Sequence, residues 1–409
     1  MKLLSLLLCT ALAILGGSST AAAQTLNVGE VLATPIVIER ETPVTSVPLE
    51  VRMGKLFMTA TVNGQAREFI FDSGSPTLLT RAFADTLDLA YIGQNTGVDA
   101  NGAQVTTDIA IAASLEIGSI RFVDVPVMVF DPPAGTPAGC IFDGGVIGSE
   151  VFPGSAWQID LETGVLRIAD AASRFETGAP EVAALLHDFG YPHAPIFDYS
   201  VGDIADKALF DTGSSEEVSL FQRVAEHPSV SNSIAPASVR RGRGSEGLSA
   251  GGYGAPVDLV RFSLGDFLID GQSPGPVRAA SRGVPPSLIG SGLLRRYIVT
   301  MDYPGQQLTL HARAEVEPAR AEPGYSISYG GEDAVVVQLF EDSAAQAAGL
   351  QLGDVVRAAQ GRDLVISSDN PLCASALWLL ESFDPRAATD IAIERDGDVL
   401  TIHLPAEQR

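Results

Sequence analysis

The fold is decided by residues 62–74, which read VNGQAREFIFDSG. Apolar residues on both sides of an Asn-Gly pair predict a β-hairpin, and the second strand runs into the polar triplet Asp72-Ser73-Gly74. A second copy at 201–213 reads VGDIADKALFDTG and ends in Asp211-Thr212-Gly213. In both copies a valine precedes the aspartate by ten residues. This self-similarity predicts an internal duplication.

The residues downstream of each triplet repeat the same spacing. Val146-Ile147-Gly148 ends 76 residues after Asp72 (148 − 72), and Leu288-Ile289-Gly290 ends 79 residues after Asp211 (290 − 211). Closing hairpins are predicted at 157–166 and 298–308, and a short helix after each triplet, such as 81–89. The short Val- and Ile-rich runs in between predict two β lobes of about a hundred residues each.

Both triplets resemble the active-site signature of aspartic proteases, Asp-Thr/Ser-Gly after a hydrophobic strand, and the resemblance covers residues 51–313. It implies an all-β-dominated chain with two retropepsin-like β-barrel lobes that form a bilobal acid protease fold. Asp72 and Asp211 would be the catalytic pair. Two close carboxyls cannot both ionise, so they share one proton and offer an acid and a base to an attacking water.

The rest of each triplet has a physical role in this interpretation. Gly74 and Gly213 let the backbone turn and approach the carboxylates closely. The resemblance implies that the hydroxyls of Ser73 and Thr212 hydrogen-bond across the lobe interface. It also implies that the two hydrophobic-hydrophobic-Gly strands thread behind the active loops. The remaining residues expected to support these loops are Ser75 and Ser214.

A β-hairpin flap that closes over the substrate is also implied by the resemblance. Residues 98–104 occupy the expected place, with Asn101-Gly102 as the turn. The equivalent region of the second lobe is the Gly-rich stretch 242–254. No convincing flap tyrosine is found, and the nearest candidates are Tyr91 and Tyr253.

The C-terminal residues 324–409 predict a small α+β unit. A strand at 334–340 precedes a short helix opened by Ser343 and ended by Gly349, and a later hairpin turns at Asp396-Gly397. The pattern resembles a PDZ domain of the bacterial protease-associated type, most specifically at 343–354. The resemblance implies that a peptide adds a strand and that its carboxylate is received by a loop formed by Gly324, Tyr325, Ser326 and Ile327.

The N-terminus has the layout of a secretory signal. Lys2 is followed by apolar residues 3–15 and by small residues up to Ala23, which predicts cleavage there rather than a retained anchor. A periplasmic or secreted protein without a membrane span is therefore expected. The predicted division is 1–23 signal peptide, 24–50 N-terminal strand or linker, 51–170 first lobe, 171–195 connector, 196–313 second lobe, 314–323 linker and 324–409 PDZ-like domain.

Composition excludes several classes of function. The chain has 26 Lys and Arg against 50 Asp and Glu, a net charge of −24, so binding to nucleic acid is not expected. The basic run 240–243 is interpreted as a solvated loop. The five histidines are scattered, which predicts neither metal nor cofactor. Cys140 and Cys373 fall in different predicted domains, so no disulfide is expected to hold the fold together.

The function predicted from the sequence is an aspartic endopeptidase acting on polypeptide substrates, with a C-terminal peptide as a second ligand at the PDZ-like domain. Three alternatives remain open. The triplets could be plain turns, or the lobes could be a catalytically inactive peptide-binding or scaffolding protein of the cell envelope. Each lobe could also pair with its twin in a homodimer.

Overall fold

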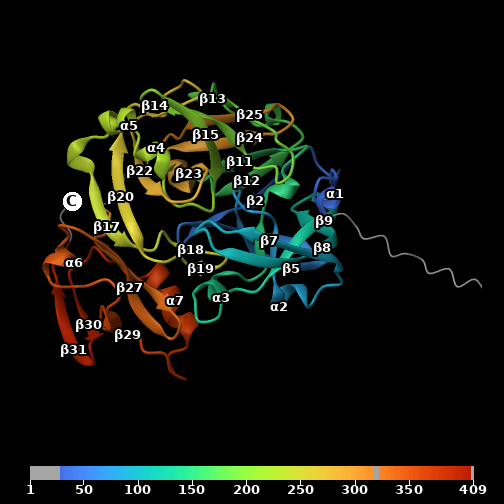
Figure 1. The fold of residues 1–409 in the computed structure, drawn as a ribbon. Coiled ribbons are helices and arrows are strands. Elements are labelled where there is room, and N and C mark those ends of the chain that lie inside the picture. The colour runs from blue at the N-terminus through green and yellow to red at the C-terminus, as the bar shows by residue number, and fades with distance from the viewer. Residues whose placement is uncertain (1–27, 317–321, 407–409) are drawn as a thin grey trace, which may run out of the picture.

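The computed structural model describes residues 28–316 and 322–406, and β-strands dominate it (Figure 1). The predicted signal peptide and part of the 314–323 linker lie outside the described residues. Within the described part of the chain, no helix is long and apolar enough to cross a membrane. A short helix, α1 (Val28–Leu32), precedes the first strand.

The first half of the chain builds a nine-stranded sheet in the order β1-β9-β6-β10-β5-β4-β8-β7, with β3 on β4. The hairpin predicted around Asn63-Gly64 is confirmed, because β4 and β5 pair antiparallel across that turn. The strands are β1 (Val37–Arg40), β3 (Glu50–Arg52), β4 (Lys55–Val62), β5 (Gln65–Phe71), β6 (Leu78–Thr80), β7 (Ala90–Val98), β8 (Gln104–Ile117), β9 (Ile120–Phe130) and β10 (Gly145–Ile147). The helical pieces are α2 (Arg81–Ala84), α3 (Ala138–Ile141) and η1 (Ser149–Val151).

The second half contributes eight strands to a 14-stranded sheet, in the order β21-β14-β15-β23-β16-β22-β20-β17. These strands are β14 (Ile196–Val201), β15 (Ile204–Asp211), β16 (Val218–Phe221), β17 (Arg240–Gly244), β20 (Val257–Leu264), β21 (Leu268–Ile269), β22 (Val277–Arg282) and β23 (Ser287–Gly290). A separate hairpin joins β18 (Leu248–Ser249) to β19 (Gly252–Tyr253). The helical pieces are α4 (Gln222–Ala225), α5 (Pro228–Ser233), η3 (Pro236–Ser238) and η4 (Ser291–Arg295).

A six-stranded sheet, β13-β25-β24-β11-β12-β2, contains strands from both halves. Both predicted closing hairpins are confirmed as β11–β12 and β24–β25, and they pair with each other through β11 and β24. Its strands are β2 (Val44–Pro48), β11 (Ala156–Asp160), β12 (Val165–Ala169), β13 (Val182–Leu185), β24 (Tyr297–Asp302) and β25 (Gln307–Ala312). Buried side chains from residue 47 to residue 310 form one hydrophobic cluster, so this sheet joins the halves through a shared core.

The C-terminal residues have a hydrophobic core of their own, formed by buried side chains between 325 and 404. The predicted helix cap is confirmed, because Ser343 Oγ accepts a hydrogen bond from the backbone N–H of Gln346. The predicted Asp396-Gly397 hairpin is also present. The elements are β26 (Tyr325–Gly330), β27 (Asp333–Phe340), α6 (Ala344–Ala347), β28 (Val355–Ala359), β29 (Arg362–Asp363), α7 (Leu372–Glu381), β30 (Thr389–Arg395) and β31 (Asp398–Leu404).

Three expectations about local structure are wrong. The helix expected at 81–89 is only the single turn α2. The stretch 171–195 is more than a connector, because β13 and the turn η2 (Ala172–Arg174) lie within it. The basic run 240–243 is not a solvated loop but belongs to β17, which pairs with β20 on one edge and with β27 of the C-terminal unit on the other.

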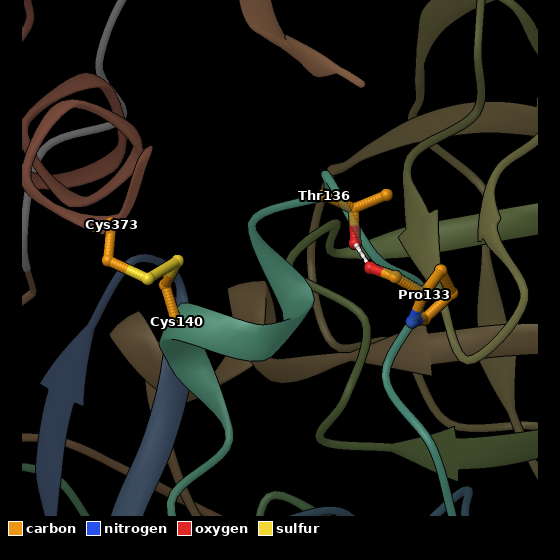
Figure 2. The surroundings of a disulfide bond; sticks show 4 residues. All are labelled: Pro133, Thr136, Cys140 and Cys373. Carbon is orange, nitrogen blue, oxygen red and sulfur yellow. Dashed lines mark hydrogen bonds between the residues drawn. A yellow bond between two sulfur atoms is a disulfide. The ribbon is translucent and has the colours of Figure 1, made fainter. Parts of the chain in front are cut away.

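The expectation that no disulfide holds the fold together is also wrong. Cys140 on α3 and Cys373 on α7 form a disulfide across 233 positions of sequence (Figure 2). The two helices pack against each other and bring the Cα atoms to 5.1 Å, within the range that a disulfide requires. The bond therefore links the first half of the chain to the C-terminal unit.

Candidate active site

Each triplet aspartate lies at the C-terminal end of a buried central strand. Asp72 directly follows β5, and Asp211 is the last residue of β15. The two hydrophobic-hydrophobic-Gly segments that the resemblance placed behind the loops lie in β10 and β23, and these pair in parallel with β5 and β15, respectively. The apolar residues before each aspartate are buried in the core, and the polar triplet then turns the chain at the strand end.

The two triplets bind each other through reciprocal hydrogen bonds. The N–H of Ser73 donates to Thr212 Oγ1 at 3.0 Å, and the N–H of Thr212 donates to Ser73 Oγ at 3.0 Å. Each hydroxyl then donates to a backbone carbonyl of the opposite strand, Ser73 to Phe210 at 2.6 Å and Thr212 to Phe71 at 2.8 Å. Both side chains are fully buried, so these bonds fix the loops in a single arrangement. The predicted contact between Ser73 and Thr212 is present.

The glycines of the triplets allow the two loops to approach closely. A Cβ atom at Gly74 would lie 2.5 Å from the carboxyl carbon of Asp211, and one at Gly213 would lie 2.2 Å from Asp72 Oδ2. Each carboxyl therefore lies against the glycine of the other half. Any larger residue at either glycine would collide with the opposite aspartate.

The Asp72 and Asp211 carboxyls lie within hydrogen-bond range of each other. Burial first, and then the neighbouring Asp211, raise the pKa of Asp72 to about 7. Backbone N–H groups stabilise both carboxylates. Gly74 donates to Asp72 at 3.0 Å, whereas Asp211 accepts from Gly213 at 2.8 Å and from Ser214 at 3.2 Å. A protonated carboxyl and a carboxylate side by side can act as acid and base.

Lys55 is a site residue that the sequence analysis missed. It begins β4 in the first half, and its Nζ donates to the carbonyl of Gly213 in the second half. Its charge lowers the pKa of Asp72, in opposition to burial and to Asp211. No motif marks it, because its position depends on how the two halves meet.

Ser75 and Ser214 support the loops through their backbone carbonyls. Ser75 O accepts from the N–H of Ser149, and Ser214 O accepts from the N–H of Ser291 at 2.8 Å. The structure therefore places them where loop support was predicted. The Ser75 hydroxyl does not donate to either aspartate, because Ser75 Oγ donates to the carbonyl of Pro76. The arrangement is the same in both halves, as the duplication predicts.

The predicted flap is the hairpin β7–β8, and its tip reaches the β18–β19 segment of the second half. The side-chain amide of Asn101 donates to the carbonyls of Gly247 and Gly252 at 2.9 and 3.0 Å. Gly102 takes the positive φ of 81° that the turn requires. Tyr253 lines the cavity below this contact, whereas Tyr91 is half exposed on β7 and does not line the cavity.

A cavity of about 690 Å³ contains both aspartates. Its apolar part includes Ile70, Leu78 and Met128, and its polar part includes Arg282, whose guanidinium donates to the flap carbonyl of Ala100 at 3.5 Å. Volume and lining are typical of a ligand-binding site, which is mostly apolar with a few polar groups. Among the described residues, no cluster of side chains suits a metal ion.

The predicted carboxylate-binding loop of the C-terminal unit is wrong as a loop. Tyr325, Ser326 and Ile327 are the first residues of β26 and pair with β27, and Gly324 O accepts from the N–H of Phe340. Tyr325 and Ile327 are buried in the local core because their apolar side chains alternate along the strand. Ser326 and Ile327 nevertheless line the cavity of the two aspartates.

A second buried carboxyl, also missed from the sequence, lies behind the Asp72 loop. Glu150 Oε2 accepts from the backbone N–H of Thr77 at 2.6 Å, and burial raises the Glu150 pKa to about 7. Thr77 Oγ1 in turn accepts from the N–H of Gly148. Glu150 is therefore a structural support of the loop and does not line the cavity.

Comparison with known families gives one match. Residues 58–151 match the family model "Aspartyl protease". That span contains Asp72, the flap hairpin and Gly148, and it supports a retropepsin-like aspartyl protease domain in the first half of the chain. The comparison with curated proteins found no match.

Proposed function

We propose that this protein is an aspartic endopeptidase in which a water bound between Asp72 and Asp211 attacks a peptide carbonyl. The single observation behind the proposal is the pair of interacting carboxyls that line one cavity, each at the end of one copy of a duplicated motif. The carboxylate takes a proton from the water while the protonated carboxyl gives one to the carbonyl oxygen. The two groups exchange roles when the amine leaves.

Residues 51–170 and 196–313 would be the two lobes of a bilobal acid protease fold. The C-terminal unit at 324–409 would be a PDZ-like domain that binds a peptide ligand as an added strand. A periplasmic or secreted location agrees with the disulfide, since such bonds persist in oxidising compartments.

The test uses the mature chain from residue 24 and an unfolded protein as substrate, at about pH 4 to 6. We expect cleavage by the wild type and by Asp88→Asn, an exposed control on the same lobe, and a loss of at least ~10³-fold in kcat in Asp72→Asn and in Asp211→Asn. Equal cleavage by all four proteins would refute the assignment of the dyad. Peptide binding without products in the wild type would instead favour the inactive peptide-binding protein.

A further inference from the structure

The cavity that contains the two aspartates is not enclosed by the duplicated halves alone. Part of its wall comes from the C-terminal unit, although that unit has its own hydrophobic core. The contributing side chains include Ser326 and Ser328 of β26, Gln338 of β27 and Leu380 of α7. The wall and the dyad therefore face one continuous space.

The C-terminal unit is attached to the second half by a strand pairing. Gly242 and Gly244 of β17 lie opposite Phe340 and Gln338 of β27. A Cβ atom at Gly244 would lie 2.2 Å from the carbonyl oxygen of Val337, so only glycine permits this approach. The Gln338 side chain adds a bond of 2.6 Å to the carbonyl of Ser245, at the start of the cavity-lining segment.

The same unit is attached to the first half by the disulfide. Cys140 lies on α3, which follows the flap sheet, and Cys373 lies near the start of α7, two turns before Leu380 (Figure 2). In Figure 1 the orange and red C-terminal unit lies against both the yellow-green β17 and the teal α3. A contact near the flaps adds to this, since Tyr253 and Ser328 share a hydrogen bond. The unit therefore bridges the two halves beside the cleft.

The chemistry of this wall is uncharged. Ser326 Oγ donates to Gln338 Oε1, Ser328 is bonded to Tyr253, and Leu380 adds a partly buried apolar surface. An extended polypeptide advances about 3.3 Å per residue, and the two aspartates and this wall line the same cavity, so a segment of several residues bound across the aspartates extends along the wall. Such a segment meets hydroxyl, amide and aliphatic groups on this side.

We propose that the C-terminal unit is a fixed wall of the substrate cleft, and that Leu380 and the adjoining polar groups select an uncharged, partly apolar stretch of polypeptide on one side of the bond to be cleaved. The disulfide holds this wall in place. The inference rests on the proposed function, because it assigns part of the substrate site. It differs from a remote recruiting role, in which the unit would capture a peptide end away from the dyad.

The first test compares Leu380→Arg with Leu400→Arg in the mature full chain. Leu400 is an exposed leucine on β31 of the same unit and does not line the cavity, so it is the matched control. The probe is a set of ten-residue peptides with one position varied at a time among Leu, Glu and Lys. For Leu380→Arg we expect the Glu-to-Lys ratio of kcat/KM to rise at least ~10-fold at one position only, because a cation now faces the substrate there. Leu400→Arg should match the wild type.

The second test uses Cys140→Ser with Cys373→Ser, which keeps the fold of each unit but removes the tether. We expect a KM increase of roughly 3- to 10-fold for the ten-residue peptides, with little change for peptides too short to reach the wall. Unchanged position preferences in Leu380→Arg, together with unchanged KM in the double serine variant, would overturn the proposal. If Leu380→Arg does not fold, Leu380→Ala replaces it, with loss of the preference for Leu at that position as the expected result.

The experiments distinguish a wrong assignment of the cleft wall from a wrong assignment of the enzyme activity. If the wild type does not cleave any peptide, the same set is tested for binding to Asp211→Asn by fluorescence anisotropy. If Leu380→Arg then raises the affinity for the Glu peptides relative to the Lys peptides, the C-terminal unit is a wall of the binding cleft, although catalysis is not supported. No shift in affinity would reject the wall as well.

Discussion

Replacement of Asp72 by Asn should stabilise the folded protein, and more so as the pH rises. The pKa of this carboxyl is raised from an ordinary value of 3.8 to about 7, mainly by burial. A raised carboxyl pKa means that the folded state holds its proton more tightly than the unfolded chain, so the resulting stability is complete below pH ~4 and is lost as the pH rises through about 7. Asparagine cannot ionise, so the Asp72→Asn variant does not lose this stability as the pH rises.

The shift sets the size of the effect. The pKa of Asp72 differs by about three between the unfolded and the folded state. This difference lowers the free energy of unfolding of the wild type by about 4 kcal/mol at pH ~8, but by only about 1 kcal/mol at pH ~4.5. The side chain keeps partial exposure to the cavity, so we take these figures as upper limits. The stability gain of Asp72→Asn over the wild type should thus grow by up to about 3 kcal/mol between the two pH values.

Urea unfolding at both pH values measures this gain. The chain has two tryptophans, and Trp157 is completely buried in the core shared by the halves, so a Trp378→Phe background gives a signal from that core alone. Asp88→Asn, which removes an exposed carboxyl from the same half of the chain, is the control. A gain for Asp72→Asn that is the same at both pH values would refute the reasoning, as would an equal pH trend in Asp88→Asn.

Two further predictions concern groups that support the dyad. Thr212→Val removes the acceptor of the buried Ser73 N–H. We expect the free energy of unfolding to fall by about 1–3 kcal/mol and kcat to fall at least ~10-fold. The exposed Thr96→Val is the control, and an unchanged kcat in Thr212→Val would contradict the positioning role. Glu150→Gln keeps an acceptor for the Thr77 N–H but cannot ionise. Because the Glu150 pKa is raised to about 7, we expect this variant to have a free energy of unfolding up to about 3 kcal/mol above that of the wild type at pH ~8, and no difference near pH ~4. Unlike Asp72→Asn, it should retain peptide cleavage, and its loss would contradict a purely structural role.

The sequence predicts well whatever depends on local pattern and on the duplication. The turn at Asn63-Gly64 requires positive φ at both residues, and the structure has 46° and 79° there. The contact between Ser73 and Thr212 was implied by the resemblance to aspartic proteases, and the structure has it as two reciprocal hydrogen bonds. The flap turn at Asn101-Gly102 differs, because only Gly102 has a positive φ there, of 81°.

What the sequence could not predict depends on contacts between separate units. Arg240 to Gly244 is polar and Gly-rich, which is typical of a loop, yet its glycines are the positions where β27 approaches too closely for a side chain. The Cys140–Cys373 disulfide joins two helices, and no periodicity in the sequence indicates that these helices pack together. The interpretation of Gly324 to Ile327 as a loop failed because Tyr325 and Ile327 alternate into a buried core, a period-two signal that favours a strand.

The departures from symmetry within the duplicated site bear directly on the chemistry. Asp211 accepts two backbone N–H bonds and Asp72 accepts one, so negative charge is better stabilised on Asp211. Lys55 favours a charge on Asp72, but burial outweighs it, because the net pKa shift of Asp72 is upward. In the proposed mechanism the pair holds one shared proton, and its titration belongs to the two carboxyls together. The different surroundings of the two copies therefore distinguish two carboxyls that an exact duplication would make equivalent.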